Sequence, residues 1–506
     1  MSSLFSTSML STTQQSAPAS TWNGALSHGT SGEALTDLFY STVRGLETDR
    51  LRLLLDRAML SDRLLTLKMI AYVRRVRGGK GERDIGRKSL EWLAERSPRD
   101  LVHNLQHYVA TFGRWDDLVY LIGNPSVKLE VLDLVAKQLK RDEQELEAGG
   151  LSISLAAKWV PSEGKKVDKV NSFNGILASH MGLTRRQMRQ LLTRLRKAID
   201  ILETHLMTKT LHEVDYSKVP SVAMNRHGKP LKAFPRNDPA RFSEYKASLA
   251  KGETKVNTDC LFPHQVIESY KHLASADELL EAQWKSILGR LTKEERGYLS
   301  STLTVIDTSG SMSSTFQHSS TKPIHVALAL GLLVTEINPN PAFKDLIVTF
   351  SSTPMFHRVQ GQSLYSRINS LQSADWGMST DFEATFRLIL SKAKEFNLSG
   401  DDMPKTLLVI SDMQFNSAGS LTNYESLQVA YKEAGYQIPK LVFWNVSGST
   451  TDFPVKASEA DTAMISGFSI EILKDVLSGE EITPFRVMMR TLNREEYKVI
   501  SLAPTP

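Results

Sequence analysis

Five oxygen-bearing side chains in the C-terminal part of the chain have the types and the spacing that a hard metal ion needs. Asp307, Ser309 and Ser311 alternate along one short segment. Thr380 and Asp412 belong to two later segments. Carboxylate and hydroxyl oxygens suit Mg²⁺ (or Mn²⁺), and two aspartates would balance the charge of the dication. We expect these residues to form one metal site, whose remaining position would accept an acidic group from a protein partner.

These side chains can meet only if the strands before them are neighbours in one sheet. Apolar runs predict buried strands over residues 303–306, 346–350, 406–410 and 441–446, and a helix is expected over residues 323–338. Strands that alternate with amphipathic helices indicate a parallel, doubly wound α/β sheet, which binds ligands at the carboxyl ends of its strands. Asp307 and Asp412 follow the first and the third of these strands, where such a site would lie.

The first three hundred residues predict helices instead of strands. Apolar residues recur at helical spacing after Ser61, after the Ser97-Pro98 pair and after Thr184, which are residue types that commonly begin helices. Successive helices with short breaks favour an α-solenoid or helical array. The expected fold class is therefore α plus α/β, with a helical solenoid followed by a doubly wound α/β domain.

Positive charge is concentrated in the N-terminal part. The whole chain has 61 Lys and Arg against 56 Asp and Glu, but residues 301–506 hold 16 against 21, which leaves 45 against 35 in residues 1–300. A basic domain of this size is compatible with phosphate binding, and solvation of helix surfaces is the alternative. The basic residues form two clusters, namely Arg74, Arg75, Arg77, Lys80 and Arg83, and later Lys165, Lys166, Arg185, Arg186 and Arg189.

The glycine-rich segment 77–83 lies inside the first cluster and has two interpretations. A nucleotide-hydrolysing phosphate loop needs a preceding strand and a Ser or Thr after its lysine, whereas here a helix is expected before it and Gly81 follows Lys80. A glycine loop before a helix N-terminus could still bind a backbone phosphate of RNA. The alternative is a helix-to-helix turn that needs glycine for its left-handed backbone angles.

Composition narrows the class of protein. The single cysteine, Cys260, excludes a disulfide scaffold and a four-cysteine zinc site, and it favours a reducing compartment. We expect an intracellular, cytoplasmic protein, with the nucleus as the alternative. The apolar runs are too short to cross a bilayer, so no membrane partner is expected. We expect a disordered Ser- and Thr-rich tail over residues 1–32, a basic helical domain over residues 33–298 and the α/β domain over residues 299–506.

Several motifs resemble those of known families. The metal-ion-dependent adhesion site of von Willebrand factor A domains is matched by Asp307, Ser309, Ser311, Thr380 and Asp412, although Met378 and Ser379 stand where that family commonly has glycines. The strings RGGKGERD (residues 77–84) and FGRWDDL (residues 112–118) resemble signatures of TROVE helical modules. AAKWVPSE (residues 156–163) and VPSVAM (residues 219–224) resemble a related, largely uncharacterised family found in plants, fungi and viruses. The order of the two parts is similar to that of Ro autoantigen-type RNA-binding proteins.

This resemblance implies a role for each part. In Ro-type proteins, HEAT-like helical repeats form a ring that the A domain closes, with noncoding RNA on the basic outer surface and single-stranded RNA ends in the cavity. By that resemblance, both basic clusters become candidate RNA contacts. The expected function is an intracellular RNA-binding scaffold whose Mg²⁺ site recruits an acidic partner, and we do not expect an enzyme.

Two alternatives remain open at this point. A metal-dependent protein–protein interaction module without RNA would use the same metal site. A metal-dependent hydrolase would use Asp307 and Asp412 around the ion, but no general base, nucleophile pair or second metal cluster accompanies them in the sequence.

Overall fold

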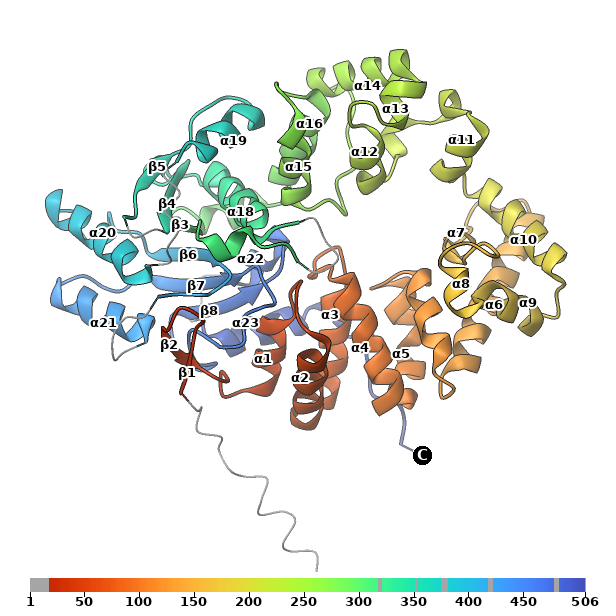
Figure 1. Ribbon diagram of the computed structural model, residues 1–506, viewed down its shortest axis with the longest axis horizontal. Helices are drawn as coiled ribbons and strands as arrows, with labels where there is room; N and C mark the ends of the chain where they lie inside the picture. Colours follow the sequence, from red (N-terminus) through yellow and green to blue (C-terminus); the bar gives the residue numbers. More distant parts are fainter. Residues whose placement is uncertain are drawn as a thin grey trace, which may run out of the picture. The chain divides into compact units, whose positions relative to one another are not determined.

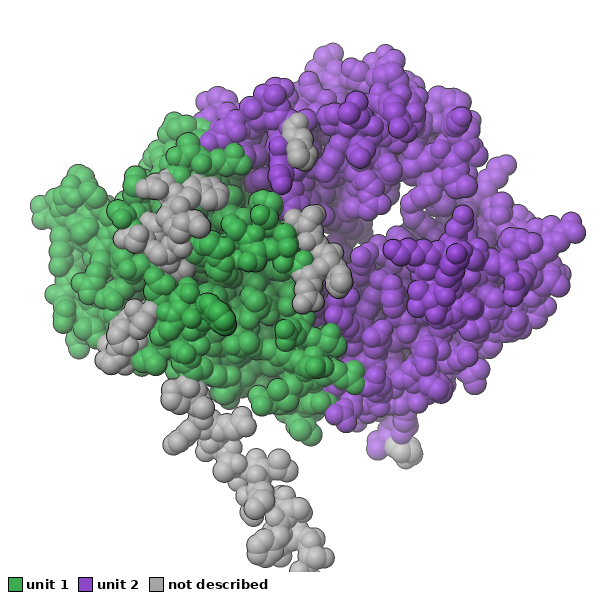
Figure 2. All heavy atoms as spheres, in the orientation of Figure 1, with its two compact units in different colours: residues 1–62, 292–360, 370–491 green, residues 63–291, 361–369, 492–506 purple. Residues whose placement is uncertain are grey.

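A six-stranded sheet and a long series of helices belong to two separate units of the chain in the computed structural model (Figure 1). The structure describes residues 18–316, 321–350, 353–374, 381–416, 422–476 and 482–505. Unit 1, green in Figure 2, comprises residues 1–62, 292–360 and 370–491. Unit 2, purple in Figure 2, comprises residues 63–291, 361–369 and 492–506.

The sheet of unit 1 has the strand order β5-β4-β3-β6-β7-β8. All neighbouring strands are parallel except β4 and β5, which are antiparallel. The chain therefore moves outward from β3 in one direction, returns to β6 on the other side of β3, and continues outward. The strands are β3 (Thr302–Asp307), β4 (Leu346–Phe350), β5 (Phe356–Arg358), β6 (Thr406–Ser411), β7 (Lys440–Asn445) and β8 (Thr462–Ser466).

Helices cover both faces of this sheet, which explains why its central strands read as continuous apolar runs. Every residue of β3 is buried. Val305 packs in a core with Phe382 and Phe386 of α20 (Phe382–Glu395). On the other face Ile306 lies against Gly331 of α18 (Pro323–Ile337), so closely that a Cβ at Gly331 would come within 2.2 Å of the Ile306 side chain. The expected α/β fold is confirmed, and the predicted strands agree with β3, β4, β6 and β7 to within one or two residues.

The remaining elements of unit 1 surround the sheet. They include two short antiparallel strands, β1 and β2, that precede the first helices. The bounds are β1 (Pro18–Ser20), β2 (Leu26–His28), α1 (Ala34–Ser41), α2 (Thr48–Ser61), α17 (Lys293–Gly297), η5 (Gly310–Ser313), α21 (Asn423–Glu433), η6 (Ile470–Ile472), α22 (Leu473–Val476) and α23 (Pro484–Leu492).

Unit 2 is helical, and helices that follow one another in the chain pack together, as α3 does on α4, α4 on α5 and α5 on α6 (Figure 1). Helices α5 and α10 begin after Ser97 and Thr184 as predicted, whereas Ser61 ends α2 instead of starting α3. None of the described helices combines the length and the apolar character that crossing a membrane requires. The bounds are α3 (Arg63–Arg74), α4 (Arg83–Arg96), α5 (Pro98–Ala110), η1 (Trp115–Gly123), α6 (Lys128–Glu147), α7 (Ala156–Trp159), α8 (Asp168–Asn171), α9 (Phe173–His180), α10 (Arg185–Ala198), α11 (Leu202–Thr208), η2 (Leu211–Glu213), η3 (Tyr216–Lys218), α12 (Ser221–His227), α13 (Ala233–Asn237), α14 (Pro239–Lys251), α15 (Pro263–Ser269), η4 (Tyr270–His272), α16 (Glu278–Leu288) and η7 (Glu495–Tyr497), while α19 (Leu364–Gln372) crosses the division at residue 369.

The units do not follow the linear domain boundaries expected at residues 32 and 298. Residues 18–20 and 26–28, expected to be part of the tail, form β1 and β2, and His28 pairs with Phe453 in a strand-like bridge. Helices α1 and α2, expected in the helical domain, belong to unit 1. At the other end, Ser501 donates a backbone hydrogen bond to Asn104 (3.1 Å) inside unit 2. Both departures from the expected boundaries depend on contacts between distant parts of the chain, which local patterns do not reveal.

Candidate functional site

Two aspartates meet at the carboxyl ends of β3 and β6, the adjacent strands from which the chain moves outward in opposite directions. Asp307 is the last residue of β3, and Asp412 follows directly after β6. This position is the topological switch point of an open parallel sheet, where ligands characteristically bind. One oxygen of Asp307 accepts a hydrogen bond from the Ser309 amide (2.9 Å), and the other accepts one from the Ser411 hydroxyl (2.5 Å).

Hydroxyl groups complete this arrangement. The Ser309 and Ser311 hydroxyls are 3.0 Å apart, and Ser311 also hydrogen bonds to Asp412. Backbone contacts hold the Asp412 loop, because the Thr450 hydroxyl donates to the Asp412 carbonyl oxygen and the Gln414 amide donates to the Asp412 carboxylate (3.3 Å). The structure thus brings together four of the five predicted metal ligands. Thr380, the fifth, lies outside the described residues.

The electrostatics of the pair suit a divalent cation. Burial raises the pKa of Asp307, against the opposing hydrogen bonds from Ser411 and Ser309. Burial, and then the neighbouring charge of Asp307, raise the pKa of Asp412. Among the described residues, neither carboxylate forms an ion pair with a lysine or arginine, so two buried acids repel each other without a compensating charge. Two carboxylates with adjacent hydroxyls match the oxygen ligands that Mg²⁺ prefers.

A cleft of about 880 Å³ opens beside Ser311 and Asp412. Part of its wall is the N-terminal strap, which we define as residues 18–28. The strap is attached to the loop that carries Asp412, because the Thr21 hydroxyl donates to the Phe415 carbonyl (2.6 Å) and the Trp22 amide donates to the Gln414 side chain (2.8 Å). The strap could not be predicted from the sequence, because its partners lie nearly 400 positions later; Thr21 and Phe415 are separated by 394 residues.

In unit 2, the structure places two of the predicted RNA contacts in the interior. The Arg74 side chain is only 3% exposed and lies 2.8 Å from the fully buried Asp117. Lys80 is completely buried, and burial holds its pKa well below the usual range. A phosphate on the surface of this structure cannot reach either side chain, so we remove both from the candidate RNA contacts.

The buried Asp117 belongs to an ion-pair network that joins the family signatures. Arg87 donates to Asp117 (2.7 Å) and to Asp116 (2.7 Å). Arg114 pairs with Asp116 (2.6 Å), and its guanidinium lies 3.9 Å from the ring centre of Trp159. The FGRWDDL and AAKWVPSE strings therefore meet in one packing cluster, to which Arg74 and Arg87, on either side of RGGKGERD, also belong. This role accounts for the charged residues Arg114, Asp116 and Asp117.

The glycine-rich segment 77–83 is a helix-to-helix turn. Its amide groups point back to the end of α3, where the Lys80 amide donates to the Tyr72 carbonyl (3.1 Å) and the Gly81 amide donates to the Arg75 carbonyl (2.7 Å). Gly81 has a φ of +67°, and a Cβ there would come within 2.7 Å of the Phe262 ring. These amides are already used inside the protein, so the turn interpretation holds and the phosphate-loop interpretation does not.

The other members of the first basic cluster differ in exposure. Arg75 pairs with Glu496 (2.8 Å), and its guanidinium lies 5.6 Å from the ring centre of Tyr497. Arg77 is exposed and pairs with Asp259 (3.1 Å), and Arg83 is exposed. This cluster therefore leaves fewer accessible cations than its sequence suggests.

The second basic cluster stays on the surface. Arg185 and Arg189 both pair with Glu163, at 3.0 and 2.6 Å. Lys165, Lys166 and Arg186 are exposed, and none of them forms an ion pair with another described residue. The α8–α10 surface, which we define as residues 158–197, thus keeps accessible positive charge.

Comparisons with known proteins place the chain in a family. Residues 301–499 match the domain of unknown function DUF7788, and residues 21–124 and 178–297 match the domain of unknown function DUF2828. The uncharacterised protein L728 of Acanthamoeba polyphaga mimivirus is 31% identical over 505 residues, which cover 93% of this chain and 86% of L728. The chain belongs to the family of L728. A crystal structure of the Deinococcus radiodurans RO (RSR) protein is similar at 15% identity with a TM-score of 0.45, over 92% of this chain and 99% of that one.

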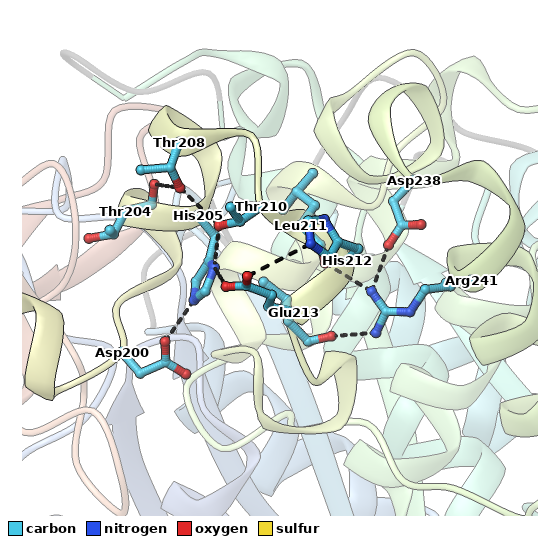
Figure 3. A network of polar contacts seen from close by, with 11 residues as sticks. Asp200, Thr204, His205, Thr208, Thr210, Leu211, His212, Glu213, Asp238 and Arg241 are labelled. Atoms are coloured by element: carbon cyan, nitrogen blue, oxygen red, sulfur yellow. Dashed lines mark hydrogen bonds and ion pairs between the residues drawn. The ribbon is translucent and has the colours of Figure 1, made fainter.

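This member of the L728 family has a further polar network in unit 2, between α11 and α14 (Figure 3). His205 is held between Asp200 (2.6 Å) and the Thr210 hydroxyl (2.9 Å). Arg241 binds Asp238 (2.9 Å) and the carbonyl oxygens of Leu211 and Val214. In the part of the chain that the structure describes, no three His, Cys, Asp or Glu side chains are placed to hold a metal ion. We interpret the network as a structural link between neighbouring helices.

Proposed function

We propose that the chain is an RNA-binding scaffold that holds noncoding RNA on its helical unit, mainly through the phosphates. The observation that carries this proposal is the charge of the α8–α10 surface, where residues 158–197 contain ten Lys and Arg against two Asp and Glu. One of these two acids, Asp168, is buried and accepts hydrogen bonds from the amides of Gly164 and Asn174. An exposed surface with such an excess of positive charge is the electrostatic footprint of nucleic-acid binding. The sequence resemblance to Ro-type RNA-binding proteins supports the same function.

The test is a triple charge reversal of the exposed, unpaired cations, Lys165→Glu, Lys166→Glu and Arg186→Glu. Each phosphate contact that is lost should reduce the salt dependence of binding by about one unit, with a joint loss of affinity of roughly tenfold or more. The matched control reverses three exposed lysines of unit 1 instead, Lys344, Lys394 and Lys432, and should bind RNA like the unaltered chain. Equal affinities of the test variant and the control would contradict the proposal.

We also propose that unit 1 binds Mg²⁺ through Asp307, Ser309, Ser311 and Asp412, with Thr380 as a further expected ligand. A bound Mg²⁺ would supply a positive centre that attracts an acidic group of a partner. The protein's own contribution is to hold two carboxylates and two hydroxyls at one sheet edge before the ion arrives. We propose that this site binds a partner and is not an active site.

A metal-dependent protein interaction module is the second candidate function. The cleft beside Ser311 and Asp412 favours it, because an acidic side chain of a partner could enter there. The test is capture of a protein partner by the chain. This candidate is favoured over RNA binding if the capture is lost with EDTA and in Asp307→Ala but persists after ribonuclease treatment. The free Cys260 is consistent with the reducing, cytoplasmic compartment that we propose for either function.

A further inference from the structure

The turn between α12 and α13 carries basic residues that belong to neither predicted cluster. No Asp or Glu occurs between Asp215 and Asp238. The same stretch contains Lys218, Arg226, His227, Lys229, Lys232 and Arg236. We refer to Arg226, Lys229, Lys232 and Arg236 as the turn cations. Such a long stretch without an acid is a local concentration of positive charge in a unit that is otherwise rich in ion pairs.

The described acids leave the turn cations without an ion pair, although the charge of Glu268 acts on Lys229. None of the four forms an ion pair or a side-chain hydrogen bond with another described residue. The acids at the two ends of the stretch are already engaged, since Asp215 pairs with Lys218 (3.3 Å) and Asp238 pairs with Arg241 (2.9 Å; Figure 3). This contrasts with the α8–α10 surface, where glutamates pair with several of the arginines.

The backbone places the turn cations close together on the outside of the unit. The Lys232 amide donates to the Lys229 carbonyl (3.0 Å), and the Arg236 amide donates to the Lys232 carbonyl (3.1 Å), so these three residues follow one another at single-turn intervals. Arg226, Lys232 and Arg236 are exposed and Lys229 is half-buried. Burial lowers the pKa of Lys229 and the charge of Lys232 lowers it further, against the opposing charge of Glu268. Lys229 and Lys232 are therefore near enough to repel each other.

The opposite side of the turn is firmly packed. Met224 of α12 and Phe234 of α13 are fully buried, and the Phe234 ring lies 5.0 Å from that of Tyr216 and 5.5 Å from that of Phe242. Between the helices, Leu231 is 86% exposed in a left-handed backbone conformation with a φ of +62°. The buried side of the turn is packed, while its exposed side carries the cations and the apolar side chain of Leu231. Such a preorganised surface lowers the entropic cost of binding a charged polymer.

We propose that the α12–α13 turn is a phosphate-backbone contact for nucleic acid, in which the four turn cations bind successive phosphates and Leu231 lies against a sugar or base. Several separate cations in a row suit a polymer of phosphates better than one small anion, which needs its ligands to converge. The inference rests on the proposed function in taking RNA as the polymer, but it concerns different residues from those of the α8–α10 surface.

The test compares the full-length chain with the variant Arg226→Glu, Lys232→Glu, Arg236→Glu. Binding of a fluorescent single-stranded RNA of about 20 nucleotides is titrated from about 50 to about 200 mM salt. We expect the affinity to fall at least tenfold and the slope of log affinity against log salt to decrease by about two, at about 0.7 per phosphate for a single strand. The Gln variant at the same three positions should give an intermediate loss. The Lys344, Lys394, Lys432 reversal has the same charge change and should stay within about twofold of the unaltered chain.

Each outcome separates this inference from the proposed function. If the unaltered chain does not bind the RNA, the proposed function is wrong. If it binds and the turn variant binds equally well, or if the unit 1 control loses as much affinity, the role of the turn is overturned while RNA binding stands. Vesicles of anionic phospholipid form a second arm, and a turn variant that loses vesicle binding but keeps RNA binding would also overturn the proposal. Unchanged circular dichroism and melting of the variant show that the loss is not due to unfolding.

Discussion

Replacing Asp117 by asparagine tests whether the charged family signatures of unit 2 are structural. Asp117 is fully buried and accepts hydrogen bonds from Arg74 (2.8 Å), Arg87 (2.7 Å) and the Arg114 amide (2.9 Å). The substitution keeps the shape of the side chain but removes its charge. Arg87 retains Asp116 as a partner, whereas Arg74, only 3% exposed, keeps a buried charge without compensation.

The size of the effect follows from that burial. Removing one partner of a buried ion pair typically costs about 3–5 kcal/mol. For a unit of this size, each kcal/mol lowers the melting temperature by about 2–4 °C, so we expect a decrease of about 10 °C in the transition of unit 2. Differential scanning calorimetry of the full chain measures the decrease. Hydrogen exchange of the α3 and α4 amides assigns it to unit 2.

Two controls sharpen the result. Asp116→Asn removes a more exposed carboxylate, at 19% side-chain exposure, whose partner Arg114 is 34% exposed, and it should cost less than Asp117→Asn. The double variant Arg74→Gln, Asp117→Asn should recover part of the lost stability, because neither buried partner is then charged. A change of less than about 2 °C for Asp117→Asn, or a loss equal to that of Asp116→Asn, would refute the argument that this network is a buried structural core.

Three further predictions concern the metal site of the α/β unit and two glycines of the helices. Mg²⁺ at about 100 times its dissociation constant should stabilise unit 1 by about 2.7 kcal/mol in thermal unfolding, and Asp307→Asn should abolish the effect; an equal stabilisation of both proteins would contradict the metal site. Gly331→Ala should destabilise unit 1 by about 1–3 kcal/mol in urea unfolding, because its Cβ would overlap the Ile306 side chain. Gly175→Ala in α9, where a Cβ meets open space, should instead stabilise unit 2 by about 0.4–1 kcal/mol, and a loss of stability there would contradict the reading of its surroundings.

The α/β unit could be predicted from the sequence because burial on both faces leaves a strong local pattern. The run before Asp307 contains apolar residues facing both α18 and α20, so it reads as a continuous strand. The proximity of Asp307 and Asp412 could also be predicted, because β3 and β6 flank the switch point of a doubly wound sheet, where the ends of the two strands meet. The strands and the proximity of the two aspartates could be predicted because the first has a local sequence pattern and the second follows from a topology with few alternatives.

Pairing of charges could not be predicted in the same way. Arg74 and Lys80 stand in a basic segment, but Arg74 is neutralised by Asp117, 43 residues later, and Lys80 is buried. The N-terminal strap falls within the tail predicted from Ser- and Thr-rich composition, and its contact with Phe415, 394 residues from Thr21, leaves no local pattern. No local pattern carries this information, since each contact forms only when distant segments pack together.

A usable signal was nevertheless present for the turn cations. The stretch between Asp215 and Asp238 has no acid at all, whereas the first predicted cluster contains Glu82 and Asp84 among its arginines. A prediction that gives less weight to basic residues with acids nearby in the sequence favours the α12–α13 turn over the α3–α4 segment as an RNA contact. The same weighting favours residues 158–197, which stay candidate RNA contacts.

The most direct test of RNA binding is ultraviolet crosslinking of the natively purified protein, followed by sequencing of the bound nucleic acid and mass spectrometry of the crosslinked peptides. The proposal predicts a defined set of noncoding RNAs, with crosslinks in residues 158–197 and in the α12–α13 turn. A preparation without RNA, or crosslinks confined to unit 1, would contradict it.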